Sequence, residues 1–551
     1  MTLTDILLLA ALAVFLLAWW VRRMPRRPIV LLVSTSVMLL AGVAGFLDDR
    51  WQALAGAGFA AVVLAVLLVN RLRRTDRARG IPFVSGTLFT LMALGPVAAI
   101  VMFPVFQLPK PSGEYAVGVR TFELADASRP GLFNAPAGAP RRLLVRVWYP
   151  AGDTSGLHQR PYFTQRESET TARTMGEAVG FPQFFAYVKH VQTNSWEDAP
   201  LMAGAARLPV VFYSHGYTSF LGQNTALMED LASHGYVVFS VQHTSDSSAT
   251  LFLNGDVIPF DPAINEMVRN TPDEGANRPQ ARALGGLTLD ERIGGHIEYR
   301  TQAAARMDRT VVASARAWVL DRLFLHDQLQ KGAVPEPIAQ IAAASDLTRV
   351  GEMGMSFGGA TTGTLCMIDK RCAAGINLDG GDFQFTAFNA DMPVPFMMFH
   401  SDQNNSYRTV EREPPATPRG FNEFSYERIA TAGTHKDIHR VQLKGSQHLG
   451  LSDFSLFIRS PLRDPLFGST PSDVMIGAQN EFVRGFFDRY LRGQPGSFPQ
   501  AQMATYKDWV LPVANSDLPA WWASKSEAAR ASLETRIEAA RATGTDRAAA
   551  P

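Results

Sequence analysis

Long apolar runs alternate with short arginine-rich segments over the first hundred residues of the chain. Four runs, at about residues 3–21, 29–47, 52–70 and 83–106, are each close to the ~20 residues that a helix needs to cross a hydrocarbon layer. A cleaved signal peptide does not explain the first run, because positive charge follows it and no small-residue cleavage site ends it. The pattern therefore predicts four transmembrane helices within residues 1–106.

The connections between these runs differ in charge. Residues 22–28 and 70–80 are rich in arginine, whereas the connection at residues 48–51 is acidic. Arginine in short loops near membrane ends marks the cytoplasmic side. We therefore expect both arginine-rich connections in the cytoplasm and everything after residue 106 on the outer side. This orientation predicts an integral protein of a bacterial inner membrane, with the larger part of the chain in the periplasm.

After Gly113 the pattern changes to short strand-like segments that alternate with helical ones. Strands are expected at residues 141–150, 208–216, 235–243, 349–355, 373–379 and 393–402, and helices at 222–234, between Asp290 and Gln330, after residue 356, and at 476–491. This alternation is typical of an α/β domain, a mostly parallel central sheet flanked by helices. We expect that domain to cover residues 107–516. Residues 517–551, rich in alanine and charge, are expected to form an exposed or frayed helical tail.

Composition excludes several classes of function. The 551 residues carry a net charge of +1, divided as +6 over residues 1–106 and −5 over the rest, so no basic surface indicates nucleic-acid binding. No glycine-rich nucleotide loop of the usual spacings is present, and no cofactor is expected. His435 and His439 are spaced like a pair of metal ligands but lack a third one, so no metal site is predicted.

Gly354-Met355-Ser356-Phe357-Gly358 forms a G-x-S-x-G motif between an apolar strand and the start of a helix. Such a motif places a serine on a tight strand-to-helix turn, where the helix N-terminus favours developing negative charge. Gly354 and Gly358 would let the strand and the helix approach each other. We therefore predict that Ser356 is the nucleophile of a hydrolase. The alternative is a glycine-rich helix start with a capping serine.

Acyl transfer at a serine also requires two backbone N–H groups that stabilise the negatively charged oxygen, the oxyanion hole. The first is predicted at Phe357, directly after the nucleophile. The second is expected in the loop Ser214-His215-Gly216-Tyr217, which ends an early strand, and we predict the N–H of Tyr217. The His215 ring is expected only to pack and to form hydrogen bonds within this loop.

An acid and a base should follow the nucleophile, because the chain order in such hydrolases is serine, acid, histidine. His448 is the predicted base, since it lies in a loop after a strand, whereas His400 lies inside a strand. Asp379 and Asp402 both close strands, and the residue pattern leaves both open as the acid.

These motifs resemble the platelet-activating factor acetylhydrolase family from about Val119 to Phe457. The likeness is carried by LLVRVWYPA, LPVVFYSHGYTSF, LASHGYVVFSVQHTSDSSAT, GMSFGGATT, GINLDGG and GSQHLGLSDF. The resemblance implies an α/β-hydrolase fold, with an acid in a Leu-Asp pair after the strand that follows the nucleophile helix. Asp379, 23 residues after Ser356, matches this position, so the resemblance favours Asp379. It also matches His243 to a histidine near the rim of the site, for which we expect a structural role.

Two features depart from the family. The membrane region has no counterpart there, and the oxyanion loop carries Tyr217 and Thr218 where a Gly-Leu-Gly-like run is usual. The motifs together predict a membrane-anchored serine ester hydrolase that acts through an acyl-enzyme on lipid-like or short-acyl esters, with membrane lipids as its surroundings. A serine peptidase or amidase of the same fold, and a membrane receptor with an inactive hydrolase domain, are the alternatives.

The two cysteines could form a disulfide. Cys366 ends the predicted nucleophile helix and Cys372 begins the next strand, with a short turn between them. Across such a turn the two Cα atoms can lie within the ~4.4–6.8 Å that a disulfide spans. The bond would persist in an oxidising compartment, which the predicted orientation supplies.

Overall fold

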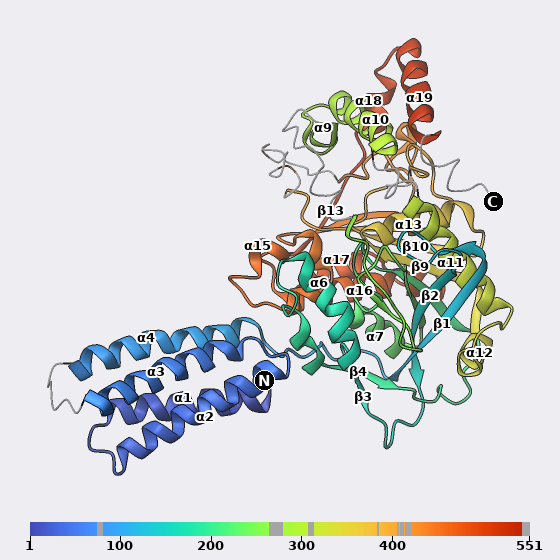
Figure 1. Ribbon diagram of the computed structural model, residues 1–551. Coiled ribbons are helices and arrows are strands. Elements are labelled where there is room, and N and C mark those ends of the chain that lie inside the picture. The colour runs from blue at the N-terminus through green and yellow to red at the C-terminus, as the bar shows by residue number, and fades with distance from the viewer. Residues whose placement is uncertain are drawn as a thin grey trace. The chain divides into compact units, whose positions relative to one another are not determined.

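The computed structural model describes residues 1–73, 81–263, 279–306, 313–382, 385–404, 407, 413 and 420–542. The chain divides into two units, whose ribbons are drawn in Figure 1. The first contains Met1–Leu108, Pro161–Gln192 and Leu456–Arg463, and the second contains Pro109–Arg160, Thr193–Ser455 and Asp464–Pro551.

The first unit is built on four helices that lie side by side: α1 (Leu3–Trp20), α2 (Arg27–Leu47), α3 (Ala53–Arg73) and α4 (Ile81–Met102) (Figure 1). A capping box begins α1, in which the Thr2 side chain accepts from the Asp5 N–H and the Asp5 carboxylate accepts from the Thr2 N–H. The rings of Phe15, Phe59 and Phe89 meet inside the bundle, with centroids 5.7 to 6.1 Å apart. Aromatic packing therefore joins α1, α3 and α4.

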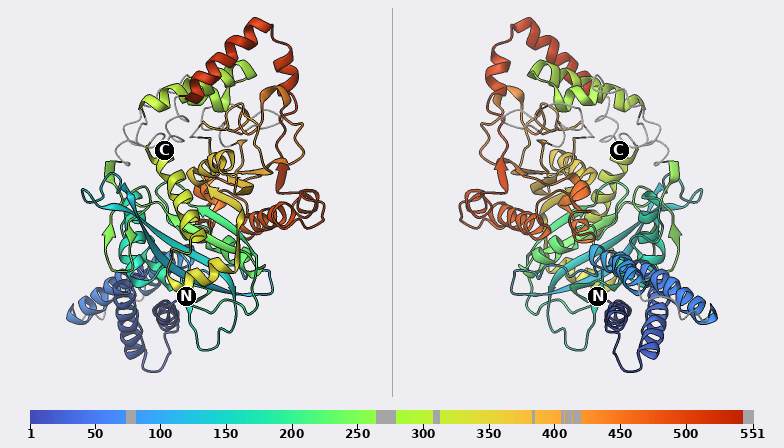
Figure 2. Two further views of the ribbon diagram at one scale, coloured as in Figure 1. Left: turned by 90° about the vertical axis from the view of Figure 1, so that its right-hand side faces the viewer. Right: turned by 90° about the vertical axis from the view of Figure 1, so that its left-hand side faces the viewer.

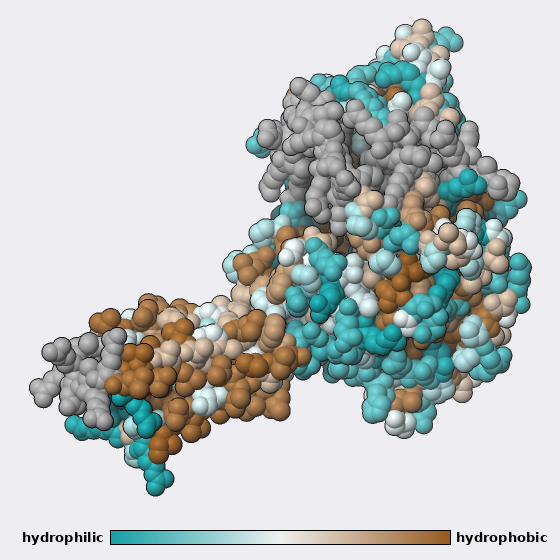
Figure 3. All heavy atoms as spheres, viewed as in Figure 1, coloured by the Kyte–Doolittle hydropathy of each residue, from teal (hydrophilic) through white to brown (hydrophobic). Residues whose placement is uncertain are grey.

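Most of the apolar surface of these helices faces outward (Figure 3). By length and composition, α1, α2 and α4 could cross a membrane, and only 33, 39 and 28% of their apolar windows is buried. The prediction of four spans is therefore wrong: among the described residues, three helices are long and apolar enough. The described apolar part of α3, Ala53–Val69, is shorter.

Two later segments of the chain complete the first unit. They carry α5 (Gln165–Glu167), η1 (Ser168–Ala172), α6 (Arg173–Ala178) and η2 (Ala186–His190), and the turn Leu456–Arg463. The Trp51 indole N–H donates to the Phe184 carbonyl at 3.1 Å, and the Arg459 N–H donates to the Met102 carbonyl at 2.9 Å. The unit thus includes residues far from 1–106 in sequence, which hydropathy alone cannot group with the helices.

The second unit is built on a sheet of eleven strands among the described residues, in the order β13-β12-β11-β10-β9-β5-β6-β2-β1-β4-β3. Their bounds are β1 (Ala116–Pro130), β2 (Pro140–Ala151), β3 (Gln159–Pro161), β4 (Gln192–Glu197), β5 (Leu208–Ser214), β6 (Val237–Gln242), β9 (Ser345–Met355), β10 (Cys372–Leu378), β11 (Phe396–His400), β12 (Ile438–Leu443) and β13 (Val510–Pro512). The strands from β6 to β12 in this order run parallel, and β1, β2 and β6 are successively antiparallel. A separate hairpin pairs β7 (Thr250–Leu251) with β8 (Val257–Ile258).

Helices cover both faces of this sheet (Figures 1 and 2). On one face, α7 (Thr225–Ser233) and α16 (Ser472–Tyr490) pack against Val211 and Tyr213 of β5. On the other face, α11 (Ala315–Gln330) and α12 (Glu336–Ala343) pack against Val210 and Phe212 of the same strand. Successive β5 side chains therefore serve opposite cores, as the period of two in a strand requires. The predicted α/β-hydrolase class is confirmed.

A third group of helices lies above the sheet, at the top of Figure 1. It consists of α9 (Pro279–Gly285), α10 (Leu289–Arg306), α18 (Leu518–Ala523) and α19 (Glu527–Ala542). Ile293 of α10 shares one buried cluster with Leu533 and Ile537 of α19. The segment between Asp290 and Gln330, expected as one long helix, contains α10 and α11. The tail was expected to be exposed or frayed, but its helix α19 buries Leu533 and Ile537 on one face. Short helices complete the unit: η5 (Ile429–Thr431), η6 (His448–Leu451), η7 (Asp453–Leu456), α15 (Asp464–Phe467) and α17 (Gln500–Thr505).

Candidate active site

Ser356 lies on the turn between β9 and α13 (Phe357–Ile368), at the carboxyl end of the parallel strands. Its backbone has φ 56° and ψ −120°, a conformation that costs a non-glycine residue about 1–3 kcal/mol. A Cβ at Gly354 would lie 2.2 Å from the backbone of Gly358, and one at Gly358 would lie 2.1 Å from the Ser214 carbonyl. Both predicted glycines are therefore needed for the turn to close. The turn places the serine hydroxyl at the N-terminus of a twelve-residue helix.

His448 lies in η6, which follows β12, and its ring contacts the serine. Its Nε2 is 2.9 Å from Ser356 Oγ, and its Nδ1 is 2.7 Å from Asp379 Oδ2. The structure thus brings the predicted nucleophile, base and first-choice acid together, from three turns at the same edge of the sheet. The His448 side chain is 46% exposed, which leaves the imidazole open to small molecules.

The Asp379 carboxylate is held from two sides. Its Oδ1 accepts the Ser401 N–H at 2.9 Å and lies 3.7 Å from His400 Nδ1, while Oδ2 faces His448. Burial alone would raise the pKa of Asp379, but the bonds with His400 and His448 outweigh burial and hold this pKa well below its ordinary value. The carboxylate is therefore ionised at neutral pH, as the partner of an imidazolium must be.

Asp402, the alternative acid, occupies a different place. Its Oδ2 accepts the Gly445 N–H at 2.7 Å and its Oδ1 accepts the Asn404 N–H at 3.0 Å. Gly445 has a φ of +70° and begins the turn that leads from β12 to His448. The bonds of Asp402 therefore shape this turn, whereas the carboxylate that faces the His448 ring belongs to Asp379.

The two residues predicted to form the oxyanion hole flank the serine. Phe357 is the first residue of α13, and a Cβ at Gly216 would lie 3.4 Å from Ser356 Cβ, so the loop that carries Tyr217 passes beside the nucleophile. The Tyr217 and Phe357 rings pack together, with centroids 5.2 Å apart. Trp318 of α11 joins them from the far side of the cluster.

Sequence reasoning missed the residues that surround His243, which lies close to the Tyr217 loop. His243 is fully buried, and its Nδ1 lies 3.0 Å from Asp321 Oδ2. Trp318 stacks on the His243 ring at 3.9 Å and donates from its indole N–H to Asp246. Asp321 and Trp318 come from α11, more than 70 residues from His243. No local motif marks them, because their role depends on a contact between distant segments.

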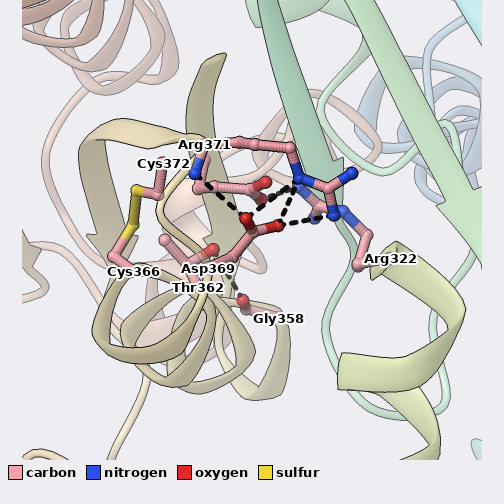
Figure 4. The surroundings of a disulfide bond; sticks show 8 residues. Arg322, Gly358, Thr362, Cys366, Asp369, Arg371 and Cys372 are labelled. Atoms are coloured by element: carbon pink, nitrogen blue, oxygen red, sulfur yellow. Dashed lines mark hydrogen bonds and ion pairs between the residues drawn. A yellow bond between two sulfur atoms is a disulfide. The ribbon is translucent and has the colours of Figure 1, made fainter. Parts of the chain in front are cut away.

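A disulfide joins Cys366 at the end of α13 to Cys372 at the start of β10 (Figure 4). The two Cα atoms are 5.1 Å apart. Asp369 lies in the turn between the cysteines and accepts from the Arg371 side chain and N–H. The bond therefore closes the connection between the helix of Ser356 and the strand of Asp379.

The remaining histidine pair forms other contacts. His435 Nε2 lies 3.2 Å from Asp391 Oδ1, and His439 Nε2 lies 2.7 Å from the Tyr490 hydroxyl. Among the described residues, no group of three or more metal-ligating side chains is found.

Comparison with known proteins gives a consistent set of relatives. The family described as "Platelet-activating factor acetylhydrolase, isoform II" matches residues 100–260. A probable 1-alkyl-2-acetylglycerophosphocholine esterase of Arthroderma benhamiae is 21% identical over 424 residues, which cover 72% of this chain and 88% of that protein. A platelet-activating factor acetylhydrolase of Cavia porcellus is 24% identical over 404 residues, which cover 70% of this chain and 78% of that protein.

A solved structure, a ferulic acid esterase from Streptomyces cinnamoneus, is 20% identical and aligns with a TM-score of 0.49 over 74% of this chain and 99% of that chain. By name, the two curated relatives are carboxylic ester hydrolases, which confirms the enzyme class predicted from the sequence. The predicted resemblance is confirmed as well: at low identity, this chain is similar to the platelet-activating factor acetylhydrolases.

Proposed function

We propose that this protein is a membrane-anchored serine hydrolase that cleaves lipid-like or short-acyl carboxylic esters through an acyl-enzyme. The observation that carries the proposal is the pair of hydrogen bonds at 2.9 and 2.7 Å that links Ser356 to His448 and His448 to Asp379. The low pKa of Asp379 and the strained turn at Ser356 support the same assignment.

The reaction begins when Ser356 Oγ attacks the ester carbonyl and His448 Nε2 takes the hydroxyl proton. Asp379 keeps the Nδ1–H of the ring pointed at its own carboxylate and stabilises the imidazolium. The N–H groups of Tyr217 and Phe357 stabilise the oxyanion of the tetrahedral intermediate. His448 then gives the proton to the leaving alcohol, and water, activated by the same ring, releases the acid. No cofactor is required by these steps.

A lipid-like substrate is supported by two independent observations. Two curated relatives are named for 1-alkyl-2-acetylglycerophosphocholine and platelet-activating factor, which are lipid esters. The part of the chain that the structure describes also carries three helices that could cross a membrane. Such an anchor would hold the enzyme beside a supply of lipid esters.

We place the hydrolase on the outer side of a bacterial inner membrane. Residues 70–80 are arginine-rich and directly precede α4, so a cytoplasmic position for them sends the chain after Met102 to the other side. The disulfide between Cys366 and Cys372 supports this placement, since disulfides persist in oxidising compartments. A reporter at the end of the full chain tests it: alkaline phosphatase activity is expected, and a fluorescent cytoplasmic reporter at that end would reverse the assignment.

An acyl-chain-length series tests the activity itself. The full chain in detergent is assayed with p-nitrophenyl esters from acetate to palmitate and with 1-alkyl-2-acetylglycerophosphocholine, and Ser356→Ala is the control. We expect hydrolysis by the wild type and none above background by the variant. Faster cleavage of aminoacyl amides than of every ester would instead identify an amidase, and equal rates for variant and wild type would remove Ser356 from the mechanism.

A further inference from the structure

The loop that carries the proposed oxyanion N–H of Tyr217 rests on a second Ser–His–Asp arrangement. His243 Nδ1 lies 3.0 Å from Asp321 Oδ2, and His243 Nε2 lies 3.0 Å from Ser214 Oγ. All three side chains are fully buried, so no substrate reaches this serine. Ser214 is the last residue of β5 and directly precedes His215 in the chain.

Charged donors fix the direction of each bond in this arrangement. Asp321 accepts from Arg141 at 2.6 Å and from Arg129 at 3.0 Å, so it is a carboxylate and His243 Nδ1 must donate to it. Burial lowers the pKa of His243 to about 4, so the ring is neutral and its Nε2 accepts the hydroxyl proton of Ser214. Arg322 donates to Ser214 Oγ at 2.8 Å. The hydroxyl thus has one donor and one acceptor and cannot rotate freely.

The main chain of His243 then fixes the tautomer of His215. The His243 N–H donates to His215 Nε2 at 3.2 Å, so this nitrogen carries the lone pair. Burial lowers the pKa of His215 to about 3, and the neutral ring carries its one hydrogen on Nδ1. Nδ1 lies 2.7 Å from the Gly216 carbonyl oxygen and donates to it. His215 therefore connects a rigid buried strand end to the peptide group between Gly216 and Tyr217.

That peptide group contains the proposed oxyanion donor. The Gly216 C=O and the Tyr217 N–H belong to one planar unit, and in a trans peptide they point in opposite directions. A bond that holds the carbonyl toward the His215 ring therefore also sets the direction of the Tyr217 N–H. The neighbouring N–H groups donate elsewhere, that of Gly216 to Gln223 at 2.7 Å and that of Thr218 to the Asp246 carbonyl at 2.8 Å.

We propose that His215 is a positioning residue, whose Nδ1–H bond to the Gly216 carbonyl aims the Tyr217 N–H at the oxyanion formed on Ser356. The buried Ser214–His243–Asp321 arrangement holds His215 in the tautomer and orientation that this bond requires. The inference rests on the proposed ester hydrolysis, and it assigns to His215 a role in the transition state beyond packing.

Two substitutions separate this role from packing. His215→Phe keeps a planar ring but removes both nitrogens, whereas His215→Asn can place an amide N–H near the position of Nδ1. His326 offers a matched control, because it is a buried histidine of the same unit whose ring bonds a carbonyl, that of Leu347, at 2.8 Å. The control variant is His326→Phe.

The assay uses the full chain in detergent, with p-nitrophenyl acetate as substrate and an alkyl trifluoromethyl ketone as transition-state analogue. Complete loss of one oxyanion donor costs about 10²–10³-fold in kcat, so misdirection by His215→Phe is expected to cost about 10- to 100-fold, with KM within about twofold. The inhibition constant of the ketone should rise by the same factor. His215→Asn should recover most of both losses, and His326→Phe should leave both within about twofold.

Retention of wild-type kcat and ketone affinity in His215→Phe, or an Asn variant no better than the Phe variant, would overturn the proposal. If His215→Phe yields no folded protein by circular dichroism, His215→Gln replaces it, because its amide nitrogen overlies Nε2 rather than Nδ1. Failure of the proposed function is distinguishable, since the wild type itself would then not hydrolyse the ester.

Discussion

The second unit contains two Ser–His–Asp arrangements of nearly the same geometry and very different surroundings. In one, His448 lies 2.9 Å from Ser356 and 2.7 Å from Asp379; in the other, the corresponding distances for His243 are both 3.0 Å. The His448 side chain is 46% exposed, whereas that of His243 is fully buried. The hydrogen-bond pattern alone therefore does not distinguish a candidate catalytic site from a structural one.

The difference lies in the serine and in the charges around it. Ser356 occupies a strained turn at a helix N-terminus, where a reacting carbonyl can approach. Ser214 is extended at the end of β5, and Arg322 donates to its hydroxyl oxygen. A hydroxyl that accepts from a guanidinium in a closed core has no free path to an electrophile. The four predictions below test this contrast, from the largest expected effect to the smallest.

Ser356→Ala should lower ester turnover by about 10⁶-fold, because the nucleophile is lost and only binding and the oxyanion hole remain. Fluorophosphonate labelling of the full chain should disappear in the same variant. Ser214→Ala is the matched control, and it should still be labelled, since its hydroxyl lies outside the reaction path. If the probe still labelled Ser356→Ala, or if labelling were lost only in Ser214→Ala, the reactive serine would be Ser214 and not Ser356.

Asp379→Asn should lower kcat by about 10⁴-fold, because a neutral amide no longer selects the tautomer of His448 in which Nδ1 carries the hydrogen. Asp402→Asn should change kcat by no more than a few-fold, since its carboxylate bonds the turn at Gly445. Steady-state kinetics on both variants decides which of the two aspartates is the acid. A larger loss of kcat in the Asp402 variant would identify Asp402 as the acid.

Ser214→Ala should lower the free energy of unfolding by about 1–3 kcal/mol, because Arg322 and His243 each lose a partner inside the core. Ser356→Ala should change this free energy by no more than about 0.5 kcal/mol, as its partner His448 is reached by water. Urea unfolding of both variants in one detergent compares them. Equal destabilisation by the two substitutions would contradict the structural role of Ser214.

Stability should fall as pH falls below about 6.5, the ordinary pKa of histidine. The pKa of His215 is lowered to about 3 and that of His243 to about 4, so between these values and 6.5 the unfolded chain binds protons that the folded chain does not. Each such histidine contributes up to about 1.4 kcal/mol per pH unit. His243→Asn should make the slope of unfolding free energy between pH 7 and 5 shallower, and an unchanged slope would show that His243 is protonated in the fold.

Much of the fold was predictable because it is encoded in local patterns. Alternation of apolar strands with amphipathic helices indicated the α/β class, and the motif around Ser356 located a strand, a turn and a helix that the structure contains as β9, Ser356 and α13. The resemblance carried by short motifs such as GMSFGG is confirmed by the relatives. Such patterns need only neighbouring residues, whose spacing follows the period of the strand or helix.

The number of spans was less predictable. Hydropathy located four apolar runs, and each forms a helix. Among the described residues, α1, α2 and α4 are long and apolar enough to cross a membrane, whereas α3 contributes the shorter apolar helix Ala53–Val69. Apolar length, rather than helix length, decides whether a helix could cross a membrane.

The sequence by itself determined the class of the fold, the place of Ser356 and the type of chemistry, because these depend on short segments. The sequence pattern alone left Asp379 and Asp402 open, and it gave no sign of Asp321 or of the role of the His215 ring. Those depend on which turn faces which across the parallel strands, and on a helix that arrives from a distant part of the chain. Only the tertiary structure decided that one carboxylate meets the exposed His448 and another meets the buried His243.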